Sequence, residues 1–373
     1  MFQTVLIPMR AARLAGAAAM IAALAGCAAS AGNQAEAGTR PVSAAAARPQ
    51  WQRFHLRGYD FPVYANHPLD GDMSRIREVV FVQHGLQRNG DDYYAAGAAL
   101  LKATGRNPDE VLLIAPNFPG TPDQGKGFDN MPRWSVQGWM SGENAVNAPF
   151  SVSSLQVMDD LLGYVTDKSR FPAVTRVTVA GHSGGAQIVH RYAVLNNVDE
   201  QVRARGIDLR YVVANPSSYL YFTPVRPASA DGKVFAPYDK SVCADYDKYR
   251  YGMQDIVPYA KGTSGLALYR RYAGRQVTYL VGSEDNDPNH RVLDKACGAE
   301  AEGPTRLQRA RGYLRYERYL ASPGLVIRHQ AFEVAGVGHD QARMFGSQCG
   351  ARAVFGLPET DNPGGAACQA PQL

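Results

Sequence analysis

Long hydrophobic runs, clusters of basic residues and metal-binding cysteine motifs are all missing from this sequence of 373 residues. The longest apolar stretch, near the N-terminus, is too short for a membrane-spanning helix. Basic residues are scattered and the formal net charge is only +5, so nucleic acid is not expected as a partner. No Cys-x-x-Cys motif or Cys/His pair at ligand spacing occurs, which argues against a zinc site. Internal repeats are also missing.

The N-terminus has the pattern of an export signal over residues 1–26. Arg10 and Arg13 are followed by an apolar, Ala-rich stretch that ends in Leu-Ala-Gly before Cys27. This ending resembles the lipobox of bacterial lipoproteins, which implies that Cys27 is acylated and becomes the first mature residue. The resemblance implies a lipid anchor in the cell envelope, with the outer membrane favoured because Ala28 rather than Asp follows. The alternative is ordinary secretion without the lipid.

Residues 27–50 consist mainly of Ala, Gly, Ser and Pro, and they cannot form an amphipathic face. We predict that they are a flexible tether, and that residues 51–373 form the folded domain. Removing the signal with its two arginines leaves 37 basic and 34 acidic residues, a formal charge of +3.

Five cysteines are present, and four remain for pairing if Cys27 carries a lipid. An even number of cysteines in an exported protein predicts disulfides. Four cysteines allow three pairings. We favour Cys243 with Cys297 and Cys349 with Cys368, because the last two lie close together in the C-terminal tail. Free buried thiols are the alternative.

The pattern of the domain predicts an α/β fold with a mostly parallel central sheet. Short apolar runs, several of them apolar on both faces, alternate with segments of helical periodicity. The expected strands are 79–82, 111–114, 177–179, 211–213, 277–281 and 331–334. The expected helices include 93–103, 154–168 and 186–195, and residues 54–59 and 61–66 are predicted to form an antiparallel hairpin at the sheet edge.

Two stretches interrupt this alternation. Residues 116–150 form a long loop with Trp134 and Trp139, and residues 217–275 form an insertion that is rich in tyrosine. Long insertions at the strand ends of such enzymes often form a substrate wall or a lid. The alternative is that the aromatic side chains pack the core of the insertion itself.

The most informative motif is Gly-His-Ser-Gly-Gly at 181–185, between an expected strand and an expected helix. A G-x-S-x-G sequence in this context is typical of a nucleophile elbow, a sharp turn that exposes a serine hydroxyl at the carboxyl edge of a sheet. We therefore predict Ser183 as a nucleophile.

A serine hydroxyl needs a base and an acid that orients the base. Two later expected strands end in such groups: Asp285 follows Gly282, and His339 lies in a Gly-rich loop. We predict His339 as the base and Asp285 as the acid, with Asp287 as the main rival and Glu284 a weaker one. The order Ser183, Asp285, His339 is similar to that of the α/β-hydrolase superfamily, and within it the chain resembles secreted esterases and depolymerases.

The resemblance also implies an oxyanion hole made of two backbone N–H groups. One is that of Gly184, directly after the nucleophile. The other comes from the loop after the strand 79–82, where a His84-Gly pair points to Leu86 or Gln87. In this loop His84 is expected to be structural.

These residues predict a serine hydrolase that cleaves a small or polymeric carboxylic ester through an acyl-enzyme and needs no cofactor. A peptidase or amidase with the same triad is a second hypothesis, because the triad does not distinguish esters from amides. A third is a non-catalytic envelope protein of the same fold, against which the complete set of Ser, His and Asp argues. The aromatic insertion suggests a partly apolar cleft.

Overall fold

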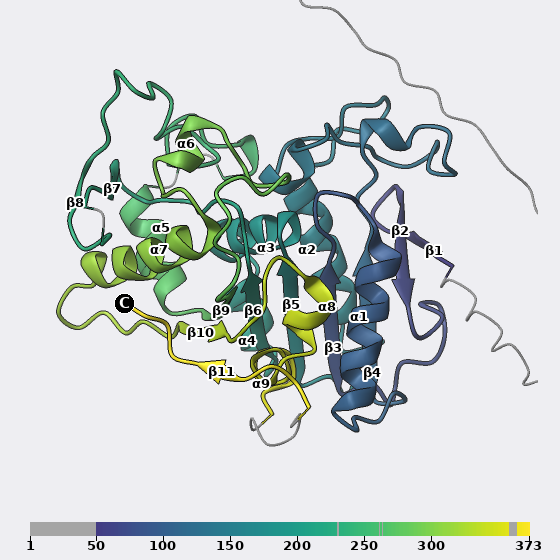
Figure 1. The fold of residues 1–373 in the computed structure, drawn as a ribbon. Helices are drawn as coiled ribbons and strands as arrows, with labels where there is room; N and C mark the ends of the chain where they lie inside the picture. Colours follow the sequence, from purple (N-terminus) through teal and green to yellow (C-terminus); the bar gives the residue numbers. More distant parts are fainter. Residues whose placement is uncertain (1–49, 230, 261, 263, 358–363) are drawn as a thin grey trace, which may run out of the picture. The chain divides into compact units, whose positions relative to one another are not determined.

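The fold is built around a mostly parallel central sheet (Figure 1). The computed structural model describes residues 50–357 and 364–373, apart from 230, 261 and 263. Within these residues, nine strands form one sheet in the order β1-β2-β4-β3-β5-β6-β9-β10-β11. The strands are β1 (Gln52–His55), β2 (Asp60–Ala65), β3 (Glu78–Gln83), β4 (Val111–Pro116), β5 (Arg176–His182), β6 (Asp208–Ala214), β9 (Gln276–Gly282), β10 (Gln330–Val334) and β11 (Cys368–Gln369). The strands from β4 to β10 in this order are parallel to one another, whereas β1, β2 and β11 pair antiparallel at the edges.

Helices cover both faces of the sheet because its strands are apolar on both faces. Along β3, Val79 and Phe81 belong to one hydrophobic cluster, and Val80 and Val82 belong to another, as the alternation of side chains along a strand requires. The first cluster includes side chains of α2 (Ser154–Val165), α3 (Gly184–Leu195), α4 (Asp199–Ala204), α5 (Gly265–Ala273) and α7 (Arg306–Leu320). The second includes those of α1 (Gly90–Ala103), α8 (Gln341–Phe345) and α9 (Gln348–Phe355). In Figure 1 these three helices lie in front of the sheet.

The predicted fold class is confirmed, since each expected strand and helix of the α/β alternation corresponds to an observed element, although the helix expected over 154–168 ends at Val165. The predicted lead-in hairpin also forms, but its first strand is β1 at Gln52–His55 rather than 54–59. Residues 56–59 instead make the turn, closed by a hydrogen bond from the Leu56 N–H to the Tyr59 carbonyl.

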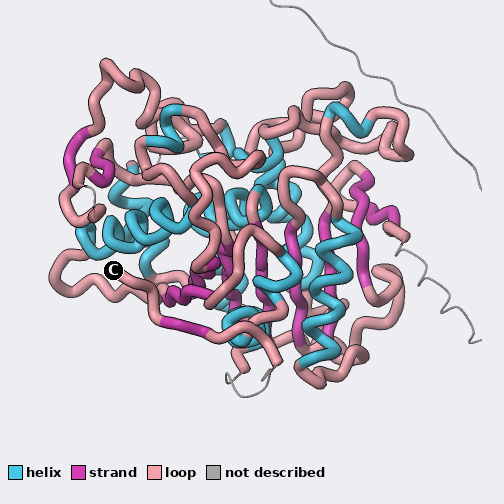
Figure 2. Tube along the Cα trace, viewed as in Figure 1, coloured by secondary structure: helices cyan, strands magenta, loops and turns pink. Residues whose placement is uncertain are grey.

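The two long interruptions are mainly loop, as Figure 2 shows. The first contains only the short 3-10 helices η1 (Thr121–Asp123) and η2 (Gly138–Ser141), and the second contains a small hairpin of β7 (Val225–Pro227) and β8 (Phe235–Pro237), then η3 (Pro258–Ala260) and α5. Their large aromatic side chains point inward: Trp134, Trp139, Tyr219 and Tyr221 are all buried. These four aromatic side chains therefore pack the interior of the protein and do not form a substrate wall or lid.

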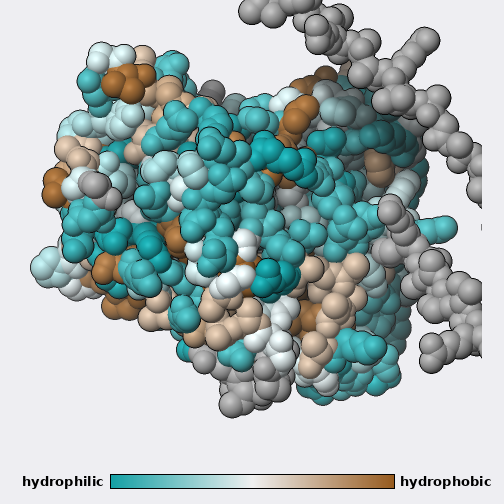
Figure 3. All heavy atoms as spheres, in the orientation of Figure 1, coloured by the Kyte–Doolittle hydropathy of each residue, from teal (hydrophilic) through white to brown (hydrophobic). Residues whose placement is uncertain are grey.

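Two disulfides stabilise the region after β6 and the C-terminus. Cys243 is bonded to Cys297, at the start of α6 (Cys297–Glu300), and Cys349 to Cys368, which is the pairing favoured from the sequence. Disulfides of this kind are typical of exported proteins. Among the residues described, no helix is long and apolar enough to cross a membrane. The face seen in Figure 3 is largely hydrophilic, with small apolar areas scattered over it. The predicted signal, the tether and Cys27 lie outside the described residues, except for Gln50.

Candidate active site

Ser183 lies at the tight turn between β5 and α3, with a φ of 60° and a ψ of −122°. A non-glycine residue rarely adopts a positive φ, and such strain is found where the surrounding structure enforces it. Here the strand and the helix approach each other so closely that a Cβ at Gly181 would lie 2.2 Å from the Gly185 carbonyl oxygen. A Cβ at Gly185 would lie 2.2 Å from the Gln83 carbonyl oxygen. The two glycines therefore permit the turn that the motif predicted.

The structure brings the three predicted triad residues into one hydrogen-bonded chain. The Nε2 atom of His339 lies 2.9 Å from the Oγ atom of Ser183, and its Nδ1 atom lies 2.8 Å from Oδ2 of Asp285. Ser183 follows β5, Asp285 follows β9 and His339 follows β10, so all three lie at the carboxyl edge of the parallel strands. This geometry lets the imidazole accept the serine proton while the carboxylate holds the ring.

Asp285 is buried and is held by partners on both oxygens. Besides His339, the Asn215 amide donates to Oδ2 at 2.5 Å, and Nη1 of Arg306 donates to Oδ1 at 3.1 Å. Burial by itself raises the pKa of Asp285, but the hydrogen bond and charge of His339 and the charge of Arg306 outweigh it. The pKa of this carboxyl group is therefore well below its usual range, and Asp285 is ionised at neutral pH.

His339 is neutral at the pH of most assays. Its burial lowers the pKa below the usual value, the hydrogen bond with Asp285 acts in the opposite direction, and the charge of Arg306 lowers it further. The ring of His182, the variable residue of the motif, lies 4.6 Å from that of His339 between ring centres. Since burial also lowers the pKa of His182 well below its usual value, this neighbour is uncharged and packs against the base.

The rival acids do not reach His339. Asp287 is exposed and accepts a hydrogen bond from the Asn289 N–H within its own loop, and Glu284 is exposed as well. Of the three carboxylates proposed from the sequence, Asp285 is the one in contact with the imidazole.

The predicted oxyanion donors lie on adjacent chain segments beside Ser183. A Cβ built on Gly184 would lie 3.1 Å from the backbone nitrogen of Leu86, so the two chain segments are adjacent. Neither N–H has a hydrogen-bond acceptor in the described part of the chain. The backbone nitrogen of Leu86 is thus the one placed next to Gly184, and Gln87 lines the cavity that holds Ser183 and His339.

His84 fixes the peptide that carries the Leu86 N–H. Its Nε2 accepts a hydrogen bond from the Phe118 N–H at 2.9 Å, so the proton lies on Nδ1, which donates to the Gly85 carbonyl at 2.8 Å. Burial lowers the pKa of His84 to about 4, so the ring is neutral. Because the carbonyl and N–H of a trans peptide point in opposite directions, holding the Gly85 carbonyl directs the Leu86 N–H away from His84. The structural role expected of His84 is therefore a positioning one.

Two cavities meet at Ser183, and both include Leu86, Arg291 and Val292 in their walls. One, of about 170 Å³, is also lined by Gln137, Met140, Gly184, Gln187, Ser217, Arg250, Leu293 and Asp294. The other, of about 290 Å³, is also lined by Gly85, Gln87, Asn89, Asp92, Tyr93, His182, His290, His339 and Gln341. The cleft is partly apolar through Leu86, Met140, Val292 and Leu293, but the tyrosines and tryptophans of the long loops do not line it, because they are buried elsewhere. A larger cavity, of about 720 Å³, lies between α7 and the C-terminal residues and contains none of the predicted site residues.

Two residues of the site were missed from the sequence. Asn215 follows β6, which pairs with β9, so its position beside Asp285 could have been inferred from the parallel neighbouring strands. Nothing in the sequence around Arg306, at the start of α7, indicates that it belongs to the site. It reaches the site only through tertiary packing, where it is buried and also donates to Ser217 Oγ and to the Val292 carbonyl.

A parallel sheet with a serine at a strand-to-helix turn and an aspartate and a histidine at later strand ends defines the α/β-hydrolase class. Residues 79–350 match the model of the family described as "Alpha/beta hydrolase family". The chain therefore belongs to this family and is a hydrolase.

Solved structures agree with this fold. Poly(aspartic acid) hydrolase-1 from Sphingomonas sp. KT-1 is 20% identical, with 83% of this chain and 99% of that chain covered and a TM-score of 0.56. LpqC, a poly(3-hydroxybutyrate) depolymerase from Bordetella parapertussis, is 22% identical, with 80% of this chain and 85% of that chain covered and a TM-score of 0.54. No curated protein sequence matches the chain significantly.

Proposed function

We propose that the protein is a serine hydrolase that cleaves carboxylic esters, small or polymeric, through an acyl-enzyme. The observation that carries this proposal is the chain of hydrogen bonds from Ser183 through His339 to Asp285, at 2.9 and 2.8 Å. Ser183 Oγ attacks the carbonyl carbon while its proton passes to Nε2 of His339. The oxygen that becomes negative is stabilised by the N–H groups of Leu86 and Gly184, and a donor of this kind contributes roughly a hundred- to a thousandfold in rate.

The first half of the reaction ends when the protonated His339 gives its proton to the leaving alkoxide and the alcohol departs. In the second half, a water molecule loses a proton to His339 and attacks the acyl carbonyl. His339 then returns this proton to Ser183 Oγ as the acid departs. Ionised Asp285 stabilises the imidazolium in both halves.

The first test is turnover of p-nitrophenyl esters of increasing acyl length, beside the p-nitroanilide of the best acyl group. Wild-type protein should hydrolyse the esters, and Ser183→Ala should lower kcat by about four to six orders of magnitude. Ser217→Ala is a matched control, because Ser217 is also a serine of the cleft but makes no contact with His339.

Other results assign the site differently. Turnover of the anilide but not of the esters would identify an amidase instead. Wild-type rates in Ser183→Ala would contradict the assignment of the nucleophile, and no turnover of either substrate would favour a non-catalytic envelope protein.

The cellular location is proposed from the sequence. Acylation at Cys27 would place the hydrolase at the cell envelope, on the tether of residues 27–50, and the two disulfides support export. The intact mass of the mature protein tests this, because a diacylated or triacylated Cys27 adds the mass of its lipid, and a protein cut elsewhere does not.

A further inference from the structure

The two cavities at Ser183 take different halves of an ester. The leaving oxygen must receive its proton from Nε2 of His339, so the alcohol half belongs in the cavity that His339 lines. The acyl half then occupies the other cavity, of about 170 Å³, which includes Gly184 but not His339. We call this second cavity the acyl chamber.

Positive charge exceeds negative charge in the walls of the acyl chamber. Its charged side chains are Arg250, Arg291 and Asp294. Arg250 is paired with Asp294 at 2.9 Å, so these two charges largely cancel. Arg291 is exposed and has no hydrogen bond or ion pair with any residue that the structure describes. The chamber therefore keeps one guanidinium that is free to bind a ligand.

A buried arginine beneath the chamber adds to this positive potential. Arg191, from α3, is fully buried, and its guanidinium donates to the Met140 and Arg250 carbonyls and to the side chains of Gln187 and Ser218. All four acceptors are neutral, and no carboxylate of the described residues forms an ion pair with it. A charge in such a low-dielectric site acts over a longer range than one in water.

The carboxyl group that could compensate Arg191 has its ionised form disfavoured. Glu302 is buried, and its burial raises the pKa to about 8 against the charges of Arg309, Arg226 and Arg191, which lower it. Its Oε1 atom has no hydrogen-bond partner among the described residues. Glu302 forms no ion pair with Arg191, so the positive charge of Arg191 is compensated only in part.

The size of the chamber limits the acyl group. A cavity of 150 Å³ in another protein accommodates benzene, which has six carbon atoms. At about 170 Å³, the acyl chamber holds a group of similar size beyond the ester carbonyl.

We propose, on the basis of the function proposed above, that the preferred acyl group carries a carboxylate about three methylene groups from the ester carbonyl. Arg291 binds this carboxylate, and the buried Arg191 adds a positive surrounding field. The substrates are thus monoesters of short dicarboxylic acids, or a polymer end of the same chemistry.

Two ethyl esters whose acyl groups have the same shape test the effect of the acyl carboxylate alone. Monoethyl glutarate and ethyl 5-methylhexanoate both have six non-hydrogen atoms beyond the ester carbonyl, but only the first ends in a carboxylate. Ethanol release gives kcat/KM for each at low ionic strength. We expect a preference of about tenfold or more for the glutarate, since a hydrogen bond to a charged group contributes at least this factor. Added NaCl should reduce the preference.

Arg291→Gln should lower the ratio of the two kcat/KM values by about tenfold. Arg318→Gln, which removes the same charge from an exposed position on α7, should leave the ratio and both rates as in the wild type. Hydrolysis of the neutral ester without a preference for the glutarate, or a preference that survives Arg291→Gln, would overturn this inference and leave the esterase proposal intact. Hydrolysis of neither ester, together with no labelling of Ser183 by a fluorophosphonate, would overturn both.

Discussion

At the scale of single residues, the environment of Asp285 determines how the candidate triad responds to pH. The carboxylate is buried between an imidazole, an amide and a guanidinium, supplied by His339, Asn215 and Arg306. A buried carboxylate with three donors stays ionised, and this favours the tautomer of His339 that accepts the serine proton. The same guanidinium repels a proton on His339, so Arg306 affects the acid and the base together.

The pH dependence of kcat/KM should report His339. The base acts in its neutral form and its pKa is lowered from 6.5, so activity should rise with pH through a midpoint below 6.5. Arg306→Gln removes a cation that lowers this pKa, and the midpoint should therefore move to higher pH. Arg315→Gln, a change of the same kind further along α7, should not move it. A midpoint that stays in place or moves to lower pH in Arg306→Gln would contradict this role of Arg306.

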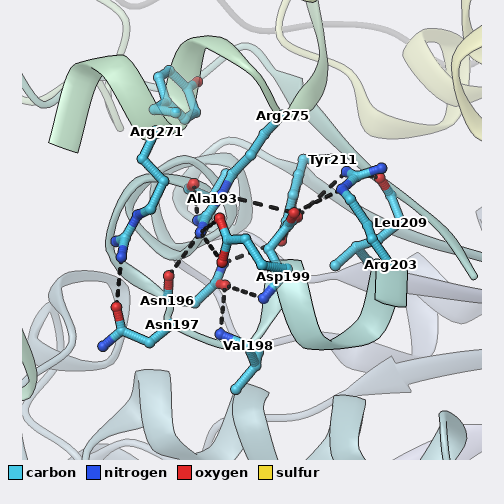
Figure 4. A network of polar contacts seen from close by, with 12 residues as sticks. Ala193, Asn196, Asn197, Val198, Asp199, Arg203, Leu209, Tyr211, Arg271 and Arg275 are labelled. Atoms are coloured by element: carbon cyan, nitrogen blue, oxygen red, sulfur yellow. Dashed lines mark hydrogen bonds and ion pairs between the residues drawn. The ribbon is translucent and has the colours of Figure 1, made fainter. Parts of the chain in front are cut away.

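At the scale of elements, α3 is held at both ends. Its first turn is fixed by the packing of the glycines around Ser183, and all of its residues are buried. At its other end, Arg275 donates to the Ala193 and Asn196 carbonyls at 2.7 and 2.9 Å, as Figure 4 shows. Cations at the C-terminus of a helix satisfy its last carbonyls and interact favourably with its dipole.

A buried aspartate supports this end of the helix. Asp199 accepts hydrogen bonds from Arg203 at 2.7 Å and from Tyr211 at 2.9 Å, and it lies 3.9 Å from Arg275 (Figure 4). Asp199→Asn leaves these cations without the buried anion and should lower the free energy of unfolding by about 2–4 kcal/mol. Urea unfolding measures this change. Asp245→Asn, which breaks an exposed pair with Lys248, should shift the midpoint little. Equal midpoints for the two variants would contradict a supporting role for Asp199.

At the scale of the whole molecule, the sequence predicted those features that depend on local pattern. The parallel strands follow from apolar runs, and the turn at Ser183 follows from a motif whose glycines leave room for the chain. The order Ser183, Asp285, His339 follows from strand ends that meet at one edge of the sheet. The hairpin bounds shifted by a few residues, because the turn at residues 56–59 is closed by backbone hydrogen bonds that residue types do not specify.

Features that depend on tertiary packing could not be predicted. Arg306 and Arg191 reach the site from helices, and nothing in their neighbouring residues indicates a buried guanidinium. The tyrosines of the insertion could line a cleft or fill a core with the same composition, and the structure places them in the core. The arginines of the cleft, Arg250 and Arg291, are therefore recognised as neighbours of Ser183 only in the folded chain.

The central claim is that Ser183 is an activated nucleophile, and covalent labelling tests it most directly. Wild-type protein and the variants Ser183→Ala and His339→Ala would be incubated with a fluorophosphonate, and peptide mass spectrometry would locate the adduct. The account predicts one adduct, on Ser183, in the wild type, none in Ser183→Ala, and labelling slowed by at least about a hundredfold in His339→Ala. An adduct on another serine, or labelling of Ser183 that does not depend on His339, would contradict it.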